Sequence, residues 1–271
     1  QVGASGRALR GRLCFPQGMA TAPLLKVIRH CDTLLRTAEV NDWDRAHNGL
    51  QVENDGRVTR IAAAVDASLA TVKLAIAANA DLLLVHHGLF WSDTVPWTGK
   101  RRELQRQLIE GNLAIYSSHL PLDLHPKLGN NAHLAAALGF KKLKPFFFEK
   151  GQHIGLQSTA KLSRNELLAR LTRATGFQAT LLPGGAAQCR RIGIVTGGAG
   201  AELRKAAAEG VDTFITGEGP HWTFALAEEL GLNVLYGGHY ATETFGVKAL
   251  ATHLAREFRV PWTFLDHPTG L

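Results

Sequence analysis

The sequence has few cysteines and no long apolar stretch. Its 271 residues include only Cys14, Cys31 and Cys189, whose wide spacing fits neither a disulfide framework nor a thiolate zinc site. No apolar run approaches the roughly 18 residues that a membrane-spanning helix needs. Hydrophobic residues make up 45% and charged residues 20% of the chain, which is typical of a globular protein rather than a disordered one. We therefore expect a soluble protein of a reducing compartment, the cytoplasm.

The excess of basic residues is small once the first residues are set aside. Residues 1–18 precede Met19, the only methionine, contain no acidic residue and lack the apolar core of a signal peptide. We interpret them as an upstream leader or a segment added by cloning. Without Arg7, Arg10 and Arg12 the formal charge falls from +7 to +4, with 27 basic and 23 acidic residues. Charge therefore does not indicate a nucleic-acid partner, and we expect none.

Apolar runs alternate with helical stretches from Ala22 onward. We expect strands at Ile61–Val65, Leu82–Val85, Leu113–Tyr116, Ile192–Val195, Thr213–Ile215, Val234–Tyr236 and Trp262–Leu265. Segments rich in Ala, Leu, Lys and Glu predict helices near residues 69–79, 101–110, 131–138, 164–175, 201–209, 221–230 and 242–258. The strands are continuously apolar, which is typical of strands covered on both faces. The pattern predicts an α/β fold with mixed, mostly parallel sheets.

Two blocks of the chain repeat the same order of elements. Arg60–Gly88 and Arg191–Gly219 align without a gap, and downstream Tyr116–Asp123 (YSSHLPLD) matches Tyr236–Glu243 (YGGHYATE). Two matches in the same order indicate an ancient duplication. The alternative is that any two strand–helix–strand units look alike.

Polar side chains follow the predicted strands of both blocks. They are His86, His87, His119, Asp123, Glu218, His239 and Glu243. Because ligands of α/β sheets lie at the carboxyl ends of the strands, we expect these residues to converge at one edge. Imidazole with carboxylate suits Zn, Mn, Fe or Co. The residues exceed the three or four ligands of a single ion and favour two metals bridged by a carboxylate.

Each feature also has a simpler interpretation. A His-His pair is more often a surface or hydrogen-bonded pair, and a His four residues before a carboxylate is common by chance. His221 is either part of the site wall or on a helix surface. Residues 197–200 (GGAG) follow a strand and precede a helix, so their backbone either cradles a phosphate or only makes a tight connection.

Several segments of the chain resemble a known protein family. They are Trp43–Val52 (WDRAHNGLQV), Val85–Trp91 (VHHGLFW), Tyr116–Asp123 with Gly129-Asn130-Asn131, Thr216–Glu218 (TGE) and Gly238–Gly246 (GHYATETFG). These motifs are similar to those of the dinuclear-metal-centre hexameric family, often labelled GTP cyclohydrolase 1 type 2 homologues and related to a yeast transcription-factor-interacting protein (Ngg-interacting-factor-three-like). VHHGLFW together with GHYATE is specific, and the resemblance covers nearly the whole chain after Met19.

The resemblance implies a metal centre, a fold and an assembly. The implied ligands of two divalent ions per chain are His86, His87, Asp123, His239 and Glu243, with Glu243 bridging. His119 and Glu218 are expected beside the pair, as supporting or proton-handling groups. The implied fold is two intertwined α/β repeats, residues 19–139 and 150–271, which share the metal site. The implied assembly is a homo-oligomer, a hexamer with its metal sites facing an inner cavity.

The chain departs from the family pattern in two places. The spacing from Asp123 to Thr216 leaves no room for the domain that some members insert between the halves. Around Asp44–Asn48 (DRAHN) the usual acidic residue before the asparagine is replaced, which leaves the implied ligand set intact.

Two functions fit these observations. The first is a metal-dependent hydrolase of a nucleotide or another phosphorylated or heterocyclic small molecule, in which an activated water attacks and Glu218 or His119 shuttles protons. The second is a non-catalytic hexameric metal-binding or regulatory scaffold, which the lack of a substrate-specific motif favours. No P-loop is present, and no motif identifies a guanine-binding pocket.

Overall fold

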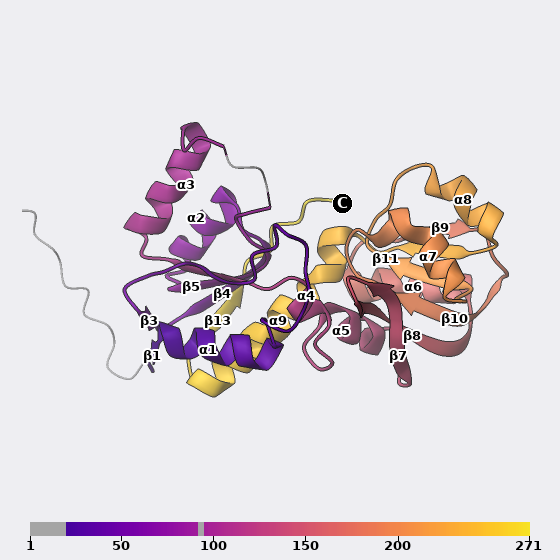
Figure 1. The fold of residues 1–271 in the computed structure, drawn as a ribbon, viewed down its shortest axis with the longest axis horizontal. Helices are drawn as coiled ribbons and strands as arrows, with labels where there is room; N and C mark the ends of the chain where they lie inside the picture. Colours follow the sequence, from indigo (N-terminus) through magenta and orange to yellow (C-terminus); the bar gives the residue numbers. More distant parts are fainter. Residues whose placement is uncertain (1–19, 92–94) are drawn as a thin grey trace, which may run out of the picture.

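The computed structural model describes residues 20–91 and 95–271 as two α/β halves side by side (Figure 1). The segment interpreted as a leader, residues 1–18, lies outside the described residues. In this part of the chain, no helix combines the length and apolar character needed to cross a membrane.

A five-stranded sheet forms the centre of the first half, with the strand order β13-β4-β5-β6-β2. Its strands are β2 (Gly49–Val52), β4 (Ile61–Asp66), β5 (Leu82–His87), β6 (Ala114–Ser117) and β13 (Trp262–Phe264). Strands β13, β4, β5 and β6 are parallel, and β2 pairs antiparallel with β6. Strands β1 (Ala22–Pro23) and β3 (Arg57–Val58) pair in a separate antiparallel ribbon.

Helices cover both faces of the first sheet. They are α1 (Leu24–Leu35), α2 (Leu69–Ala77), α3 (Gly99–Glu110) and α9 (His239–Phe258). Successive residues of a strand face opposite sides of its sheet. Accordingly, Ile61 and Ala63 of β4 pack in one core with α1 and α9, whereas Ala62 and Ala64 pack in another with α2 and α3. Burial on both faces explains why these strands are continuously apolar.

The second half contains a six-stranded sheet with the order β7-β8-β10-β11-β12-β9. Its strands are β7 (Leu143–Glu149), β8 (Gln152–Ser163), β9 (Thr180–Pro183), β10 (Gln188–Ile194), β11 (Thr213–Thr216) and β12 (Asn233–Tyr236). Its core also includes residues of helices α5 (Asn130–Ala137), α6 (Arg164–Thr175), α7 (Leu203–Ala208) and α8 (Thr223–Leu230). The short elements α4 (Leu120–Asp123) and the 3-10 helix η1 (Ala199–Glu202) complete the described helices.

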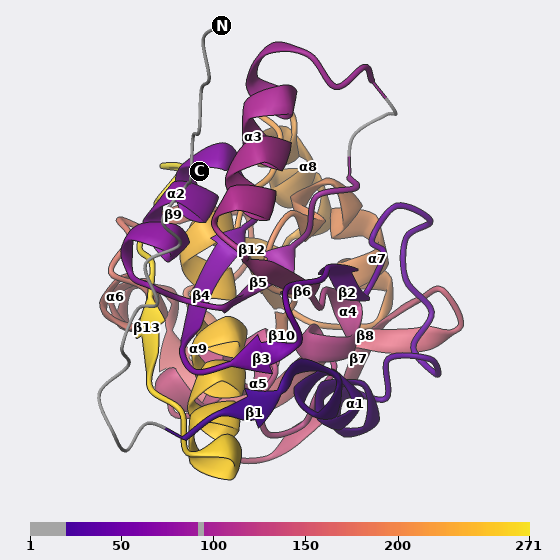
Figure 2. The same cartoon turned by 90° about the vertical axis from the view of Figure 1, so that its left-hand side faces the viewer.

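The two halves are intertwined through exchanged helices. Helix α5 follows the first sheet in sequence, but its Leu134 packs in the core of the second sheet. Helix α9 follows β12 of the second sheet, but its Val247 and Leu250 pack against the first sheet. Figure 2 shows α9 running beside β13, which adds to the first sheet next to β4. The prediction of two intertwined, duplicated α/β repeats is confirmed.

The predicted strands and helices are present, and the prediction missed helix α1 and the antiparallel strands. Parallel pairing is confined to β10, β11 and β12 in the second sheet, whereas β7, β8 and β9 pair antiparallel. Strands β7 and β8 form a hairpin whose turn residues Lys150 and Gly151 have φ values of 51° and 79°. Two positive φ values are typical of the tight turns that join antiparallel strands.

The packing of α9 predicts a large stability loss for Leu250→Ala. Leu250 is 1% exposed in the core between α9 and the first sheet, and a buried Leu→Ala change costs about 2–5 kcal/mol. Urea denaturation should show this loss, with Glu257→Ala on the exposed part of α9 as the near-neutral control. A loss below about 1 kcal/mol for Leu250→Ala would contradict the proposed importance of this helix.

Candidate metal centre

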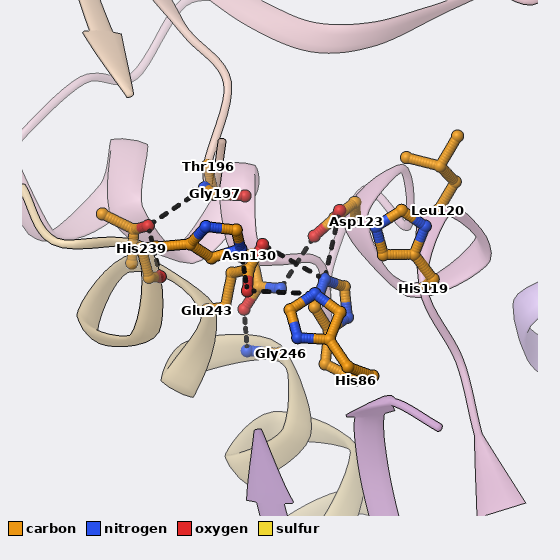
Figure 3. Close-up of polar contacts among 12 residues, drawn as sticks. His86, His119, Leu120, Asp123, Asn130, Thr196, Gly197, His239, Glu243 and Gly246 are labelled. Carbon is orange, nitrogen blue, oxygen red and sulfur yellow. Dashed lines mark hydrogen bonds and ion pairs between the residues drawn. The ribbon is translucent and has the colours of Figure 1, made fainter. Parts of the chain in front are cut away.

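The residues singled out in the sequence meet where the two halves face each other. His86 and His87 end β5, and His119 follows β6. His239 begins α9, and Glu243 lies one helical turn further along the same helix. Figure 3 shows the Glu243 carboxylate between His239 on one side and His86 and Asp123 on the other.

The Glu243 carboxylate faces two groups of donor atoms. Its Oε1 lies 3.5 Å from Nε2 of His86, which is itself 3.5 Å from Oδ2 of Asp123. Its Oε2 lies 3.4 Å from Nε2 of His87 and 3.2 Å from Nε2 of His239. One carboxylate oxygen therefore joins each group, which is the arrangement of a carboxylate that bridges two ions.

Two of these atoms are buried without a hydrogen-bond partner. They are Nε2 of His86, a residue with no exposed surface, and Oε2 of Glu243, a residue that is 2% exposed. An unpartnered buried polar atom is costly, most of all in an ionised group. Imidazole and carboxylate donors converging in this way fit divalent transition metals such as Zn, Mn, Fe or Co. The residues present therefore fit the metal pair expected from the sequence.

The other ring nitrogens of these histidines are held by the protein. Nδ1 of His87 lies 2.8 Å from Oδ1 of Asp66, and Nδ1 of His239 lies 2.8 Å from Oε1 of Glu218. Nδ1 of His86 lies 3.0 Å from a backbone carbonyl oxygen. If Nδ1 carries the proton and donates, Nε2 is left as the free electron-pair donor, which is how proteins orient metal-binding histidines.

Asp123 is positioned by a buried asparagine. The side-chain amide of Asn130 donates to Oδ1 of Asp123 at 2.7 Å, and its own oxygen accepts from the backbone N–H of Gly246 at 2.6 Å. Asn130 is fully buried. This residue of α5 therefore links Asp123 to α9, the helix that carries Glu243.

His119 lies beside the ligand candidates and is oriented by a carboxylate that the sequence analysis did not identify. Its ring centroid is 4.9 Å from that of His86 and 5.7 Å from that of His87. Its Nδ1 lies 2.8 Å from Oδ1 of Asp42. Ligand atoms of these three histidines lie within 4.8 Å of one another.

Two supporting carboxylates were missed from the sequence. Asp66 is the last residue of β4, so the rule that placed polar residues at strand ends would also have found it. Asp42 lies in the loop before β2, and no spacing indicates it. Glu218 contacts His239 as its hydrogen-bond partner. His221 is exposed and does not line the cavity beside the site.

The glycine-rich loop makes room for the metal centre. Gly197 has a φ of 75°, and a Cβ atom there would lie 2.2 Å from Oε1 of Glu243. Three of the loop's four N–H groups are used within the protein: Gly197 donates to Oγ1 of Thr242, Ala199 to Oγ1 of Thr216 and Gly200 to the backbone oxygen of Glu218. These contacts favour the tight-connection interpretation of this loop over the phosphate cradle.

A cavity of about 700 Å³ opens onto the candidate ligands. Its lining includes His87, His119, Asp123, His239 and Glu243. Apolar and aromatic side chains from both halves form much of the remaining wall. A cavity of this size and character is typical of a small-molecule site.

Opposite charges in the candidate centre stabilise one another's ionised forms in the metal-free protein. Burial disfavours the charged form of His86, but Asp123 and Glu243 outweigh burial and hold its pKa well above the ordinary value. Burial opposes ionisation of Glu243 as well, and the surrounding histidines hold its pKa well below the ordinary value. For His239, Glu243 and Glu218 outweigh burial and raise the pKa to about 9.

Comparisons with known proteins agree with the sequence resemblance. The model of a family described as Duf34/NIF3 (NGG1p interacting factor 3) matches residues 23–269. A protein of Deinococcus radiodurans named GTP cyclohydrolase 1 type 2 homolog is 43% identical over 84% of this chain and 88% of its own length. A Halobacterium salinarum protein of the same name is 44% identical over 86% of this chain and 94% of its own.

Solved structures share the fold. The crystal structure of TTHA1606 from Thermus thermophilus has a TM-score of 0.85 and 40% identity, covering 92% of this chain and all of its own. Reduced HcgD from Methanocaldococcus jannaschii has a TM-score of 0.81 and 25% identity, and it also covers 92% of this chain and all of its own. The fold of both halves is therefore found in proteins of bacteria and archaea.

The support of His87 by Asp66 predicts that Asp66→Asn weakens metal binding. Loss of such a partner typically lowers metal affinity by about 10–100-fold. Competition with a chelator of known affinity should measure this, and Asp44→Asn, an exposed change in a nearby loop, is the matched control. Equal affinities in the two variants would show that Asp66 does not support a ligand.

The raised pKa of His239 predicts that protons compete with metal. The charged imidazole stabilises the folded metal-free protein fully below its ordinary pKa of 6.5, and this stabilisation is lost as the pH rises through about 9. Metal affinity should therefore increase with pH up to about 9, with proton release on binding. An NMR titration of metal-free protein should find this pKa, and Glu218→Gln should lower it. A pKa unchanged in the variant would contradict the role of Glu218.

Proposed function

The chain belongs to the DUF34/NIF3 family, and from this premise we propose that it is a dinuclear metal-dependent hydrolase of a small molecule. The observation that carries the proposal is the Glu243 carboxylate, which has one oxygen toward His86 and the other toward His87 and His239. A cavity large enough for a small molecule opens directly onto these side chains.

In this proposal His86 and Asp123 would hold one ion, His87 and His239 would hold the other, and Glu243 would be shared between them. The support for this division is the pairing of donor atoms at 3.2–3.5 Å. When bound, the ions supply Lewis acidity and make water acidic enough to provide hydroxide near neutral pH.

The remaining polar residues have different roles in the proposal. His119 handles the proton, because it lines the cavity and its Nδ1 is held by Asp42. Burial opposes ionisation of Asp42, but hydrogen bonds from His119 and Asn48 outweigh it and lower the pKa of Asp42, so that this carboxylate stays charged and holds the His119 ring in place. Glu218 positions His239 by contacting Nδ1, the ring nitrogen that does not face Glu243.

The proposed assembly is a homo-oligomer, with the hexamer as the state that the family resemblance implied. Exposed apolar side chains on α2 and α3, two helices that contact each other, support a self-interface, since Leu74 is 41% and Ile109 is 79% exposed.

Elemental analysis of untagged protein, followed by a hydrolysis screen, tests the proposal. We expect about two metals per wild-type chain, loss of both in Glu243→Ala, and retention of both with loss of turnover in His119→Gln. Metal retention in wild type without hydrolysis of any screened compound would favour the non-catalytic scaffold. A wild-type chain that stays metal-free after reloading with Zn, Mn or Fe would overturn the metal centre itself.

A further inference from the structure

We propose that the cavity beside the metal centre takes a planar ring compound without phosphate groups, and that it discriminates against nucleotides. This inference rests on the proposed function, whose substrate class it narrows. It is carried by the charges of the cavity lining, by the glycine-rich loop, and by one aromatic and one hydroxyl side chain.

The described residues that line the cavity include no lysine or arginine to receive a phosphate. Outside the metal centre its charged side chains include Glu149 and Glu202. A phosphate chain carries several negative charges, and placing like charges together at a binding site costs several kcal/mol.

Two lysines that contact residues of the cavity lining are already engaged. The ammonium group of Lys205 pairs with Glu149. Lys150 lies with its ammonium group 4.2 Å from the ring centroid of Trp43, a residue of the cavity lining. Recruiting either group to a phosphate would break a favourable contact.

The backbone does not supply the missing phosphate site either. Phosphate-binding loops present several free N–H groups, but three of the four in this loop, those of Gly197, Ala199 and Gly200, donate to oxygens of the protein, which leaves at most the N–H group of Gly198. The following 3-10 helix spans only Ala199–Glu202 and ends on an acidic residue of the cavity lining.

An aromatic wall suits a planar ring instead. Phe147 lines the cavity with a φ of 62°, a conformation that is strained for a bulky residue and is found most often at functional sites. The conformation is held by Glu209, which accepts hydrogen bonds from the N–H groups of Phe147 and Phe148 at 2.8 and 2.7 Å. Phe147 is itself only 2% exposed, and its ring already contacts the Phe214 ring at 5.8 Å and the ammonium group of Lys205 at 5.2 Å, so it supports the wall from within rather than offering a free face. Glu209 is therefore a positioning residue for this wall.

A buried hydroxyl group provides a contact for the edge of the ring. Thr196 lines the cavity and is 6% exposed, and its Oγ1 has no hydrogen-bond partner. A bound ring with a nitrogen or oxygen at its edge would satisfy this group, which otherwise remains unpaired. Trp43 and Trp91 add further aromatic surface to the same lining.

Matched pairs of compounds that share a ring and differ in phosphate test the inference. The probes are guanosine and GTP, pyridoxal and pyridoxal phosphate, and riboflavin and its monophosphate. Affinities are measured by calorimetry on metal-free protein, which removes the ions that a phosphate could bind, and again with zinc. We expect ring compounds to bind the metal-free protein about tenfold or more tightly than their phosphorylated partners. Equal or tighter binding of a phosphorylated partner, or no binding of any ring compound, would overturn the inference.

Two substitutions sharpen the test. Thr196→Val removes the hydroxyl at nearly constant volume and should weaken ring binding by about 3–10-fold. Glu202→Lys should improve binding of the phosphorylated partners, whereas the control Glu202→Gln should improve it less. Metal content of each variant separates the two proposals. A chain with two metals that rejects the rings refutes only the ring-binding inference, and a chain that binds rings but no metal refutes only the hydrolase.

Discussion

The buried carboxylate of Glu243 is the constraint on which the rest of the structure depends. A charged group that is 2% exposed is tolerated only if opposite charge or metal surrounds it. His86, His87 and His239 provide that surrounding, and each is fixed in turn by a backbone carbonyl, Asp66 or Glu218. The same carboxylate explains the glycine at position 197, because a side chain there would collide with Glu243 and displace it.

The exchange of helices between the halves places this carboxylate at their boundary. Helix α9 begins at the edge of the second sheet and packs along the first, so Glu243 on its first turns reaches the histidines that end β5. Helix α5 is exchanged in the opposite direction, and its Asn130 is connected to the same site by hydrogen bonds with Asp123 and Gly246. Neither half could complete the site alone, which gives a physical reason for the intertwined topology.

Much of this was predictable from the sequence because it depends on local patterns. Burial on both faces makes β4 and β5 continuously apolar up to their last residues, and the polar residues at their ends stand out against that background. The hairpin of β7 and β8 was missed because Leu143–Glu149 and Gln152–Ser163 mix exposed and buried residues. Asp42 was missed because it reaches His119 across 77 positions, and no periodicity records a contact at that separation.

The duplicated halves contribute similar residues that have come to differ in role. Each copy places a histidine at the start of a helix and a carboxylate one turn later, His119 with Asp123 and His239 with Glu243. One oxygen of Asp123 is bound by Asn130, whereas both oxygens of Glu243 face histidines. Only the carboxylate of Glu243 therefore faces histidines with both of its oxygens. In the first copy His119 is held by Asp42 at the cavity wall, which leaves that side of the centre open to a ligand.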